Sequence, residues 1–395
     1  MIELAGKHNI AKIFTDNIDQ ETISQLIELL NQPFTTNSQI RIMPDCHAGK
    51  GCVVGTTMTL TDKVVPNLVG VDIGCGMYAI KLEETEIDMA LLDTVINTYV
   101  PSGFSIHDHA VTDYTKLKDY TCDINTENAK RSIGSLGGGN HFIEIDQDGA
   151  SNLWLVIHCG SRHLGIEVCD YYQKAGFKAI KNNNIKAKID AKITELKAKG
   201  LEKEIENTIK ILKMQTPNVP EHLAYVEGTL FDNYIHDMKL TQEYAKLNRK
   251  TIADIIINKM NLHPVDAFDT IHNYIDIDNM ILRKGSISAQ LDEKVIIPMN
   301  MRDGSLICVG KGNPDWNYSA PHGAGRIMSR SQAKDLIDFE EFKKSMNGIY
   351  STSVVESTID EAPMVYKPMT EIIKNIKDTV NIIDIIEPIY NFKAH

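Results

Sequence analysis

The sequence predicts an α+β fold in which mixed sheets form one compact domain, residues 1–395, and a helical hairpin projects from it. Three observations support this prediction. Glycine-rich segments with β-branched residues recur along the chain, a lysine-rich segment has the composition of solvated helices, and no low-complexity linker interrupts the sequence. The motifs described below extend from residue 45 to residue 367, which favours a single domain closing around one centre.

The composition is that of a globular protein, with 43% hydrophobic and 24% charged residues. The 53 acidic and 41 basic residues give a formal net charge of −12, which argues against a general nucleic-acid coat protein but allows a local basic cleft. No run approaches roughly eighteen apolar residues, and the opening MIELAGKHNIAKIF lacks the apolar core of a secretion signal. We therefore expect a cytoplasmic protein without a membrane partner. The seven scattered cysteines favour free thiols or metal ligands over a disulfide framework.

The expected elements follow the chain in order. The first forty residues predict short strands and then a helix near residues 21–30, and residues 41–80 predict strands joined by tight turns. A second strand-rich block covers residues 133–165. Residues 172–217 predict the projecting hairpin, because residues 174–213 contain eleven lysines and five acidic residues, a surplus of six positive charges.

The remaining elements alternate in type. The sequence predicts an amphipathic helix at 240–262, a loop at 261–276, strands near 295–299 and 305–310, a glycine-rich stretch at 310–330, and helical segments from 335 onward that alternate with a loop at 361–368.

The segment GVDIGCGM, residues 70–77, contains a first candidate site. Asp72 and Cys75 follow an apolar strand, and the flanking glycines let the backbone bend so that both side chains can reach one point. A carboxylate and a thiolate can hold a divalent ion such as Mn²⁺ or Zn²⁺, and thiolate sulfur can bridge two ions. A buried cysteine with only a packing role is the alternative.

Three histidines extend this set. His141 lies in GGGNHFIEI, His158 in VIHCGSRHLG and His272 in IHNYID. One Asp, one Cys and three His are too many ligands for a single tetrahedral ion with an open position, and they suit two ions that share the thiolate. A lone histidine is more often an ordinary core residue, so the prediction depends on the whole set.

His322, in APHGAGR, is a candidate nucleophile. The adjacent Gly-Ala-Gly leaves backbone amides uncrowded for phosphate oxygens, and Arg326 and Arg330 could neutralise further phosphate charge. An imidazole nitrogen can form a covalent bond to phosphorus. A glycine turn with a structural histidine is the alternative, and no Walker A pattern occurs in the sequence.

Together these motifs resemble those of the RtcB-type RNA-splicing ligases, GTP-dependent enzymes that join RNA ends. The resemblance rests on segments that follow the family's order between residues 43 and 367: MPDCHAGKG, VGVDIGCGM, GGGNHFIEI, IHCGSRHLG, IHNYI, RKGSISA, GNPDWNYSAPHGAGRIMSR and EAPMVYK. It implies an RtcB-like domain whose mixed sheets surround a central cleft for metal and nucleotide.

The resemblance also implies a role for each matching residue. One Mn²⁺ ion would be bound by Asp72, Cys75 and His141, and a second by Cys75, His158 and His272. His322 would become guanylylated, Asp45 would orient it, and Arg162 would hold an RNA terminal phosphate. The nucleotide site would comprise Asn140, His141, Phe142, Ile143, Glu144, His272, Asn273, Pro298, Met299, Asn300, Met301, Ser305, His322, Gly323, Ala324, Gly325 and Lys367. Within it, Glu144 would accept hydrogen bonds from guanine and Lys367 would contact the base.

One segment departs from the family. Many members have IPGSMG where this chain has IPMNMRDGS, so Asn300 would replace a serine near the nucleotide phosphates. An amide can still donate to phosphate, although with different geometry. Ser305 would keep a second serine role.

The implied reaction joins an RNA 3′-phosphate or 2′,3′-cyclic phosphate end to a 5′-hydroxyl end. It would use GTP and two Mn²⁺ ions, pass through a covalent histidine–GMP intermediate and an RNA-ppG end, and act on tRNA halves or broken RNA. The alternatives are a dinuclear metallophosphoesterase, a binding protein that has lost its chemistry and an enzyme that caps RNA ends. For the lysine-rich hairpin, a role in guiding RNA is the alternative to a solvated surface. The sequence does not specify a protein activator, and Cys with His could equally suit Zn²⁺.

Overall fold

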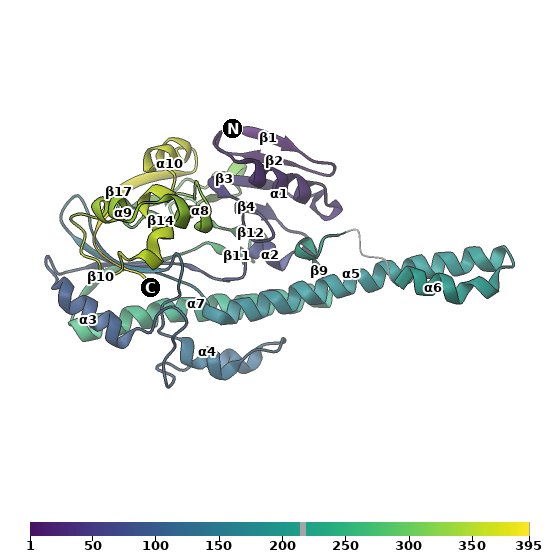
Figure 1. Ribbon diagram of the computed structural model, residues 1–395, viewed down its shortest axis with the longest axis horizontal. Helices are drawn as coiled ribbons and strands as arrows, with labels where there is room; N and C mark the ends of the chain where they lie inside the picture. Colours follow the sequence, from purple (N-terminus) through teal and green to yellow (C-terminus); the bar gives the residue numbers. More distant parts are fainter. Residues whose placement is uncertain (214–218, 395) are drawn as a thin grey trace.

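The α+β class is confirmed by the computed structural model, which describes residues 1–213 and 219–394 (Figure 1). A 6-stranded sheet has the order β1 (Ile2–Ala5), β2 (Ile10–Ile13), β3 (Ile40–His47), β4 (Val54–Thr59), β12 (Ile281–Lys284), β11 (Asn273–Asp276). A 7-stranded sheet has the order β10 (Pro264–Ile271), β6 (Gly76–Leu82), β8 (Leu153–Cys159), β7 (Phe142–Gln147), β17 (Val380–Phe392), β15 (Gly304–Gly310), β14 (Lys294–Asn300). Two further pairs are β13 (Ser286–Ser288) with β16 (Ser319–Pro321) and β5 (Lys63–Val64) with β9 (Val226–Glu227).

The described α-helices are α1 (Gln20–Leu30), α2 (Pro66–Val69), α3 (Met89–Tyr99), α4 (Thr126–Ser132), α5 (Arg162–Ala198), α6 (Ile205–Lys213), α7 (Thr229–Met260), α8 (Arg330–Leu336), α9 (Phe339–Ser345) and α10 (Met369–Asn375). Short 3₁₀ helices are η1 (Pro33–Thr35), η2 (Thr115–Asp119), η3 (Glu202–Glu204), η4 (Glu221–Leu223), η5 (Pro314–Trp316), η6 (Glu356–Glu361) and η7 (Pro363–Val365). Among the helices in these parts of the chain, none has the length and apolar character needed to span a bilayer.

The helix predicted near residues 21–30 is confirmed as α1. Its first turn is capped by Asp19, whose carboxylate accepts a hydrogen bond from the backbone amide of Thr22 at 2.8 Å. Leu26 and Leu30 lie one turn apart and are both buried. This apolar side of the helix packs against β1 and β2, as the helical spacing of the leucines requires.

The helices α5 and α6 form an arm that projects far from the sheets (Figure 1). The sequence predicts a hairpin from residue 172, whereas α5 begins earlier, at Arg162. One side of its first turns belongs to the core, because Leu164 and Tyr172 are buried there. The predicted end of the hairpin, residues 214–217, lies outside the described residues.

Lysines on the arm pair with acidic residues of the same helix. The Nζ of Lys192 lies 2.6 Å from Glu195, and that of Lys199 lies 2.7 Å from the same carboxylate. Lys210 pairs with Glu206 at 3.2 Å. Exposed pairs of this kind contribute little to stability but are typical of a solvated helical surface.

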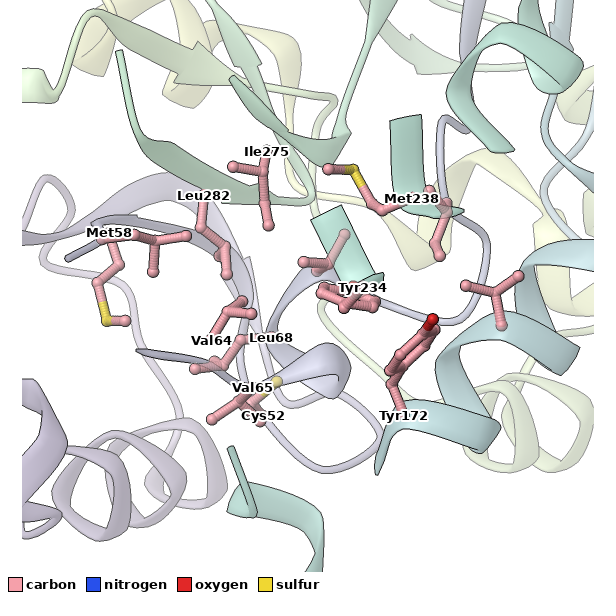
Figure 2. Packing of buried hydrophobic residues seen from close by; sticks show 14 of the residues in the cluster. Cys52, Met58, Val64, Val65, Leu68, Tyr172, Tyr234, Met238, Ile275 and Leu282 are labelled. Carbon is pink, nitrogen blue, oxygen red and sulfur yellow. The ribbon is translucent and has the colours of Figure 1, made fainter. Parts of the chain in front are cut away.

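The long helix α7 starts well before the predicted helix at 240–262. Its early residues Tyr234 and Met238 are fully buried, and Figure 2 shows them beside Tyr172 of α5. The same cluster includes Leu282 of the 6-stranded sheet. The helices α5 and α7 are therefore attached to this sheet by one continuous hydrophobic core, which fixes them relative to the strands.

Two segments that the sequence predicts as loop or helix are strands. Residues 261–276, predicted as a loop, contain β10 and β11, because β10 pairs along its length with β6. The chain end, predicted as helical segments and a loop, contains the 13-residue strand β17 between β7 and β15. Its sequence VNIIDIIEPIYNF lacks clean alternation, and its register shifts between Pro388 and Tyr390, so only the long-range pairing reveals the strand.

Replacing Leu282 with Ala is expected to lower the free energy of unfolding by about 2–5 kcal/mol, because the side chain is fully buried in the core that joins sheet and helices. Urea denaturation followed by the fluorescence of buried Trp154 and Trp316 measures this change. The control Leu291→Ala, at a side chain that is 70% exposed, is expected to change stability by about 0.5 kcal/mol or less. Equal effects of both substitutions would contradict this view of the core.

Candidate active site

Four of the predicted metal ligands lie together at the ends of neighbouring strands of the 7-stranded sheet. In the register of its strands, Gly76 pairs with both Cys159 and Ile271. His158 lies opposite Met77 on one side and Phe142 on the other. Cys75 precedes β6, His141 precedes β7, His158 lies near the end of β8 and His272 follows β10, so the four side chains meet where these antiparallel strands begin and end.

A first group comprises Asp72, Cys75 and His141, whose ligand atoms all lie within 4.8 Å of one another. The Nε2 of His141 is 3.2 Å from the Cys75 sulfur and 3.1 Å from the Asp72 carboxylate. The backbone amide and hydroxyl of Ser161 donate to the other Asp72 oxygen at 2.8 and 3.1 Å. The carboxylate is therefore held in place from both sides.

A second group comprises Cys75, His158 and His272, which are all buried. The Cys75 sulfur lies 3.4 Å from Nε2 of His158, so this cysteine belongs to both groups as the sequence predicts. The Nδ1 of His158 lies 3.1 Å from the main-chain oxygen of Asn140, and a carbonyl can only accept. The proton of His158 is therefore on Nδ1, and the lone pair of Nε2 points toward the sulfur.

The groups of this site differ in the protonation state that their surroundings favour. Burial, together with the neighbouring His141, holds the pKa of His158 well below its usual value, so its imidazole is neutral. Burial and the charge of Asp72 raise the pKa of the Cys75 thiol to about 12. A bound divalent ion reverses the second preference, because a coordinating thiol is deprotonated. Carboxylate, thiolate and imidazole together are a donor set that fits a divalent transition-metal ion.

The candidate nucleophile His322 is fixed by Asp45. Its Nδ1 lies 2.6 Å from the Asp45 carboxylate, and the backbone amides of His322 and Gly323 donate to the same oxygen at 3.0 and 3.2 Å. Asp45 is fully buried. The ring of His322 lies next to that of His272, with centroids 4.8 Å apart. When the ring is neutral and Nδ1 donates to Asp45, the lone pair is on Nε2. The imidazole lies beside the metal-type cluster, which consists of Asp72, Cys75, His141, His158 and His272.

A cavity of about 660 Å³ opens beside His322. It is lined by eleven of the residues predicted for the nucleotide: Asn140, Phe142, Glu144, Pro298, Met299, Asn300, Met301, His322, Gly323, Ala324 and Gly325. It is also lined by the candidate metal ligand His158. The candidate nucleophile, the candidate metal ligands and a nucleotide-sized cavity thus share one place in the fold.

The family follows from the extent of the match. A family model described as tRNA-splicing ligase RtcB matches residues 25–124 and 106–394. The chain belongs to the RtcB family. It is 29% identical over 410 residues to the RNA-splicing ligase RtcB of Escherichia coli strain K12, a match that covers 93% of this chain and 92% of the relative. It is 25% identical over 471 residues to the tRNA-splicing ligase RtcB of Methanococcus maripaludis, with 95% and 91% covered. It is therefore an enzyme, an RNA ligase.

Some residues predicted for the nucleotide site of this RtcB ligase do not line the cavity: His141, Ile143, His272, Asn273, Ser305 and Lys367. Ile143 packs in the core because neighbouring side chains of β7 point to opposite faces, and Phe142 and Glu144 take the cavity face. Ser305 is fully buried on β15. The ammonium of Lys367 donates to the main-chain oxygens of Pro44 and Asn17 at 2.8 and 3.1 Å.

Two other predicted contact residues of the ligase already have protein partners. The amide of Asn300 donates to the carboxylate of Asp303 at 2.8 Å. Asn300, which stands where many members of the family have serine, is therefore hydrogen-bonded within its own turn. The guanidinium of Arg162 donates to the main-chain oxygen of Gly103 at 2.7 Å and to the hydroxyl of Ser135 at 3.0 Å. Arg162 has a φ of 57°, a left-handed conformation that is rare outside glycine.

Arg326 and Arg330, which the sequence suggests for neutralising phosphate charge, also line the cavity, together with Glu361, Tyr366 and Lys393, which the sequence does not single out. The arginines and Tyr366 occur in quoted motifs, but their grouping depends on the tertiary structure. Lys393 follows β17, the strand that the sequence did not predict. Its Nζ lies over the Phe142 ring, 5.4 Å from the centroid. No local signal marks this lysine, because its place depends on the pairing of β17 with β7.

Arg249 of helix α7 contacts the backbone next to two residues of the metal-type cluster. The fully buried guanidinium of Arg249 donates to the main-chain oxygens of Gly74 and Cys159 at 2.7 and 2.9 Å. Gly74 directly precedes the candidate ligand Cys75, and Cys159 directly follows the candidate ligand His158. Asp269 holds the guanidinium at 2.7 and 2.8 Å. The arginine thus fixes the spacing of two ligand-bearing segments, a contact that the helix sequence alone does not reveal.

Glycines leave room for the ligands. A Cβ atom at Gly160 would lie 2.2–2.4 Å from the Asp72 carboxylate, and one at Gly137 would lie 2.0 Å from Nδ1 of His141. Both glycines therefore allow a backbone segment to pass directly against a ligand side chain.

Replacing Gly160 with Ala is expected to weaken Mn²⁺ binding by about 10–100-fold, because the new methyl group displaces the Asp72 carboxylate. Titration with Mn²⁺, followed by electron paramagnetic resonance of the free ion, measures the affinity. Gly149→Ala is the control, since its Cβ would meet only Asp384, 3.9 Å away. Wild-type affinity in the Gly160 variant would show that Asp72 does not contribute to the ion site.

Proposed function

We propose that this RtcB ligase joins an RNA 3′-phosphate or 2′,3′-cyclic phosphate end to a 5′-hydroxyl end, with GTP as the activating nucleotide. The observation that carries the proposal is the Asp45–His322 pair, in which Asp45 contacts Nδ1 of an imidazole that lies beside the cavity and the metal-type cluster. A phosphoesterase does not require such an oriented histidine beside a nucleotide-sized cavity. The proposed substrates are tRNA halves or broken RNA.

The first step forms a covalent intermediate. Nε2 of His322 attacks the α-phosphorus of GTP, a P–N bond forms, the bond from that phosphorus to the bridging oxygen breaks, and pyrophosphate leaves. The ring becomes positively charged as it loses its lone pair. Asp45, hydrogen-bonded to Nδ1, stabilises that charge and keeps the ring oriented.

Two transfers complete the reaction. An oxygen of the RNA 3′-phosphate attacks the guanylyl phosphorus, the P–N bond breaks, and Nε2 regains its lone pair while an RNA-ppG anhydride forms. The 5′-hydroxyl then attacks the RNA phosphorus, loses its proton and expels GMP, which leaves a 3′,5′ phosphodiester. We propose that Arg162 assists by holding the RNA terminal phosphate, since the preceding residue, Ser161, donates hydrogen bonds to the candidate metal ligand Asp72.

We propose two Mn²⁺ ions as the metals of this site. One would be held by Asp72, Cys75 and His141, and the other by Cys75, His158 and His272. When bound beside His322, such ions neutralise phosphate charge.

The base is proposed to bind where Phe142, Glu144 and Lys393 line the cavity. Glu144 is buried, and its carboxylate accepts a hydrogen bond from Asn391 at 2.6 Å. Its oxygens suit the N–H donors of guanine, and Phe142 offers a face for stacking. We propose Lys393 as the cavity's ammonium in place of Lys367, which donates to backbone oxygens away from this lining.

His322→Ala is expected to abolish covalent labelling by α-labelled GTP and Mn²⁺, because the variant has no nitrogen for phosphorus to bond. Labelled protein is detected by denaturing gel electrophoresis. The control His109→Ala alters an exposed histidine and is expected to label like wild type. Persistent labelling of the His322 variant would overturn the nucleophile, and RNA end turnover by wild type without GTP would favour the metallophosphoesterase.

The affinity for guanine nucleotide is expected to fall as pH decreases below 7. Burial raises the pKa of Glu144 to about 7 even though Asn391 and Lys393 oppose the shift. Below that pH the carboxyl is protonated and loses acceptor capacity, so affinity should fall toward tenfold per pH unit. Calorimetric titration of the His322→Ala protein with GTP measures this dependence without covalent chemistry.

The matched comparison is the same titration with Glu144→Gln added. This variant retains every titration of the GTP phosphates but has no carboxyl at position 144. It is expected to bind weakly and to lose the extra pH dependence. Identical pH profiles for the two proteins would rule out Glu144 as the guanine acceptor.

A further inference from the structure

We propose that Glu361 is a positioning residue for nucleotide recognition, which holds the cationic groups of the cavity wall in place through a single buried carboxylate. The inference rests on the proposed function, since it concerns how the same cavity binds GTP. Glu361 lines the cavity but is only 3% exposed. Its carboxylate is thus available to neighbouring side chains more than to solvent.

Both carboxylate oxygens of Glu361 are engaged. One lies 2.6 Å from the guanidinium of Arg330 and 3.3 Å from that of Arg326. The other lies 3.2 Å from the ammonium of Lys393 and accepts a hydrogen bond from the Tyr366 hydroxyl at 2.7 Å. Three cations and one hydroxyl therefore converge on one side chain.

The partners of Glu361 come from separate parts of the chain. Arg326 follows the His322 segment, Arg330 begins α8, and Lys393 follows β17. Without the shared carboxylate, three positive groups would repel one another within a few ångströms. Glu361 is the contact that allows these segments to present their cations together at one cavity wall.

The carboxyl group of Glu361 stays ionised. Burial alone would raise its pKa, but Lys393 and Arg330 outweigh burial and hold the pKa at about 2. Glu361 is therefore ionised at every pH at which the enzyme would work, and a neutral amide of the same shape removes its charge without changing its size.

The cations that Glu361 holds contact the nucleotide-facing segments. Lys393 lies over the Phe142 ring and donates to the main-chain oxygen of Asn140 at 3.4 Å. A Cβ at Gly139 would lie 3.4 Å from the Arg330 guanidinium, so this arginine packs on the loop that leads to Asn140. A shift of these cations would change the walls that Asn140 and Phe142 form, and so would alter nucleotide binding more than the chemistry at His322.

The test is the steady-state ligation of RNA ends by Glu361→Gln at varied GTP and saturating RNA, with the melting temperature of each protein measured in parallel. We expect KM for GTP to rise by about 10–100-fold and kcat to change by less than about threefold. Mn²⁺ affinity should remain at the wild-type value, because the partners that the described structure gives Glu361 are Arg326, Arg330, Lys393 and Tyr366, and none of these is a candidate metal ligand. A variant with the wild-type melting temperature and an unchanged KM would overturn the inference.

The neighbouring Asp360 offers a matched control. Its carboxylate also binds Arg330, at 2.5 Å, and lies 3.9 Å from the ammonium of Lys334. Asp360→Asn removes the same charge and is expected to alter KM by less than about threefold. An equal rise in KM in both variants would indicate a general charge effect and would overturn the specific role of Glu361.

Two further variants keep the test decisive if Glu361→Gln fails to fold. Glu361→Asp retains the charge on a shorter side chain and is expected to give an intermediate KM. Combining it with Lys393→Met should produce less than the sum of the two separate effects, because one acts through the other. Additive effects would overturn the inference. Absence of labelling in the wild-type protein would instead refute the proposed use of GTP.

Discussion

The register of three antiparallel strands is the constraint on which the active site depends. Met77 of β6 and Phe142 of β7 both lie opposite His158 of β8, and this alignment brings Cys75 and His141 to the same place. Since side chains alternate along a strand, a slip of one residue would turn His158 to the other face of the sheet. The shared cysteine therefore requires correct pairing between segments more than eighty residues apart, and the hydrophobic core below the strands maintains that pairing.

The two large sheets contribute different parts of the chemistry. The 7-stranded sheet holds the metal-type cluster, whereas Asp45 is part of β3 in the 6-stranded sheet. His272 lies between β10 and β11, which are consecutive in the chain but belong to different sheets. The contact between the rings of His272 and His322 is thus also the junction of the two sheets. The proposed activation of GTP would depend on this junction as much as on any single side chain.

The sequence predicts the parts of the site that reside in compact motifs. Asp72, Cys75 and His322 each stand among glycines in a short segment, so their chemistry can be inferred locally. Glu361 and Lys393 could not be grouped in this way, because their proximity depends on β17, a strand stabilised by pairing with distant segments. The hydrogen bonds from Arg249 to Gly74 and Cys159 could not be predicted either, since the sequence around Arg249 is typical of any partly buried helix. The predicted starts of α5 and α7 lie too far along the chain, because in both helices the first, partly buried turns are followed by charged, exposed turns.

The arm formed by α5 has a mechanical consequence. The helix is 37 residues long, which at the usual rise corresponds to about 55 Å, and it starts at Arg162, beside the metal-type cluster. Its first turns are clamped in the core while its far end lies in solvent (Figure 1). A stiff rod anchored in this way acts as a lever with a short inner arm and a long outer arm. A load applied at the outer end therefore produces a torque at the inner end, where the backbone of Arg162 is already in an uncommon conformation.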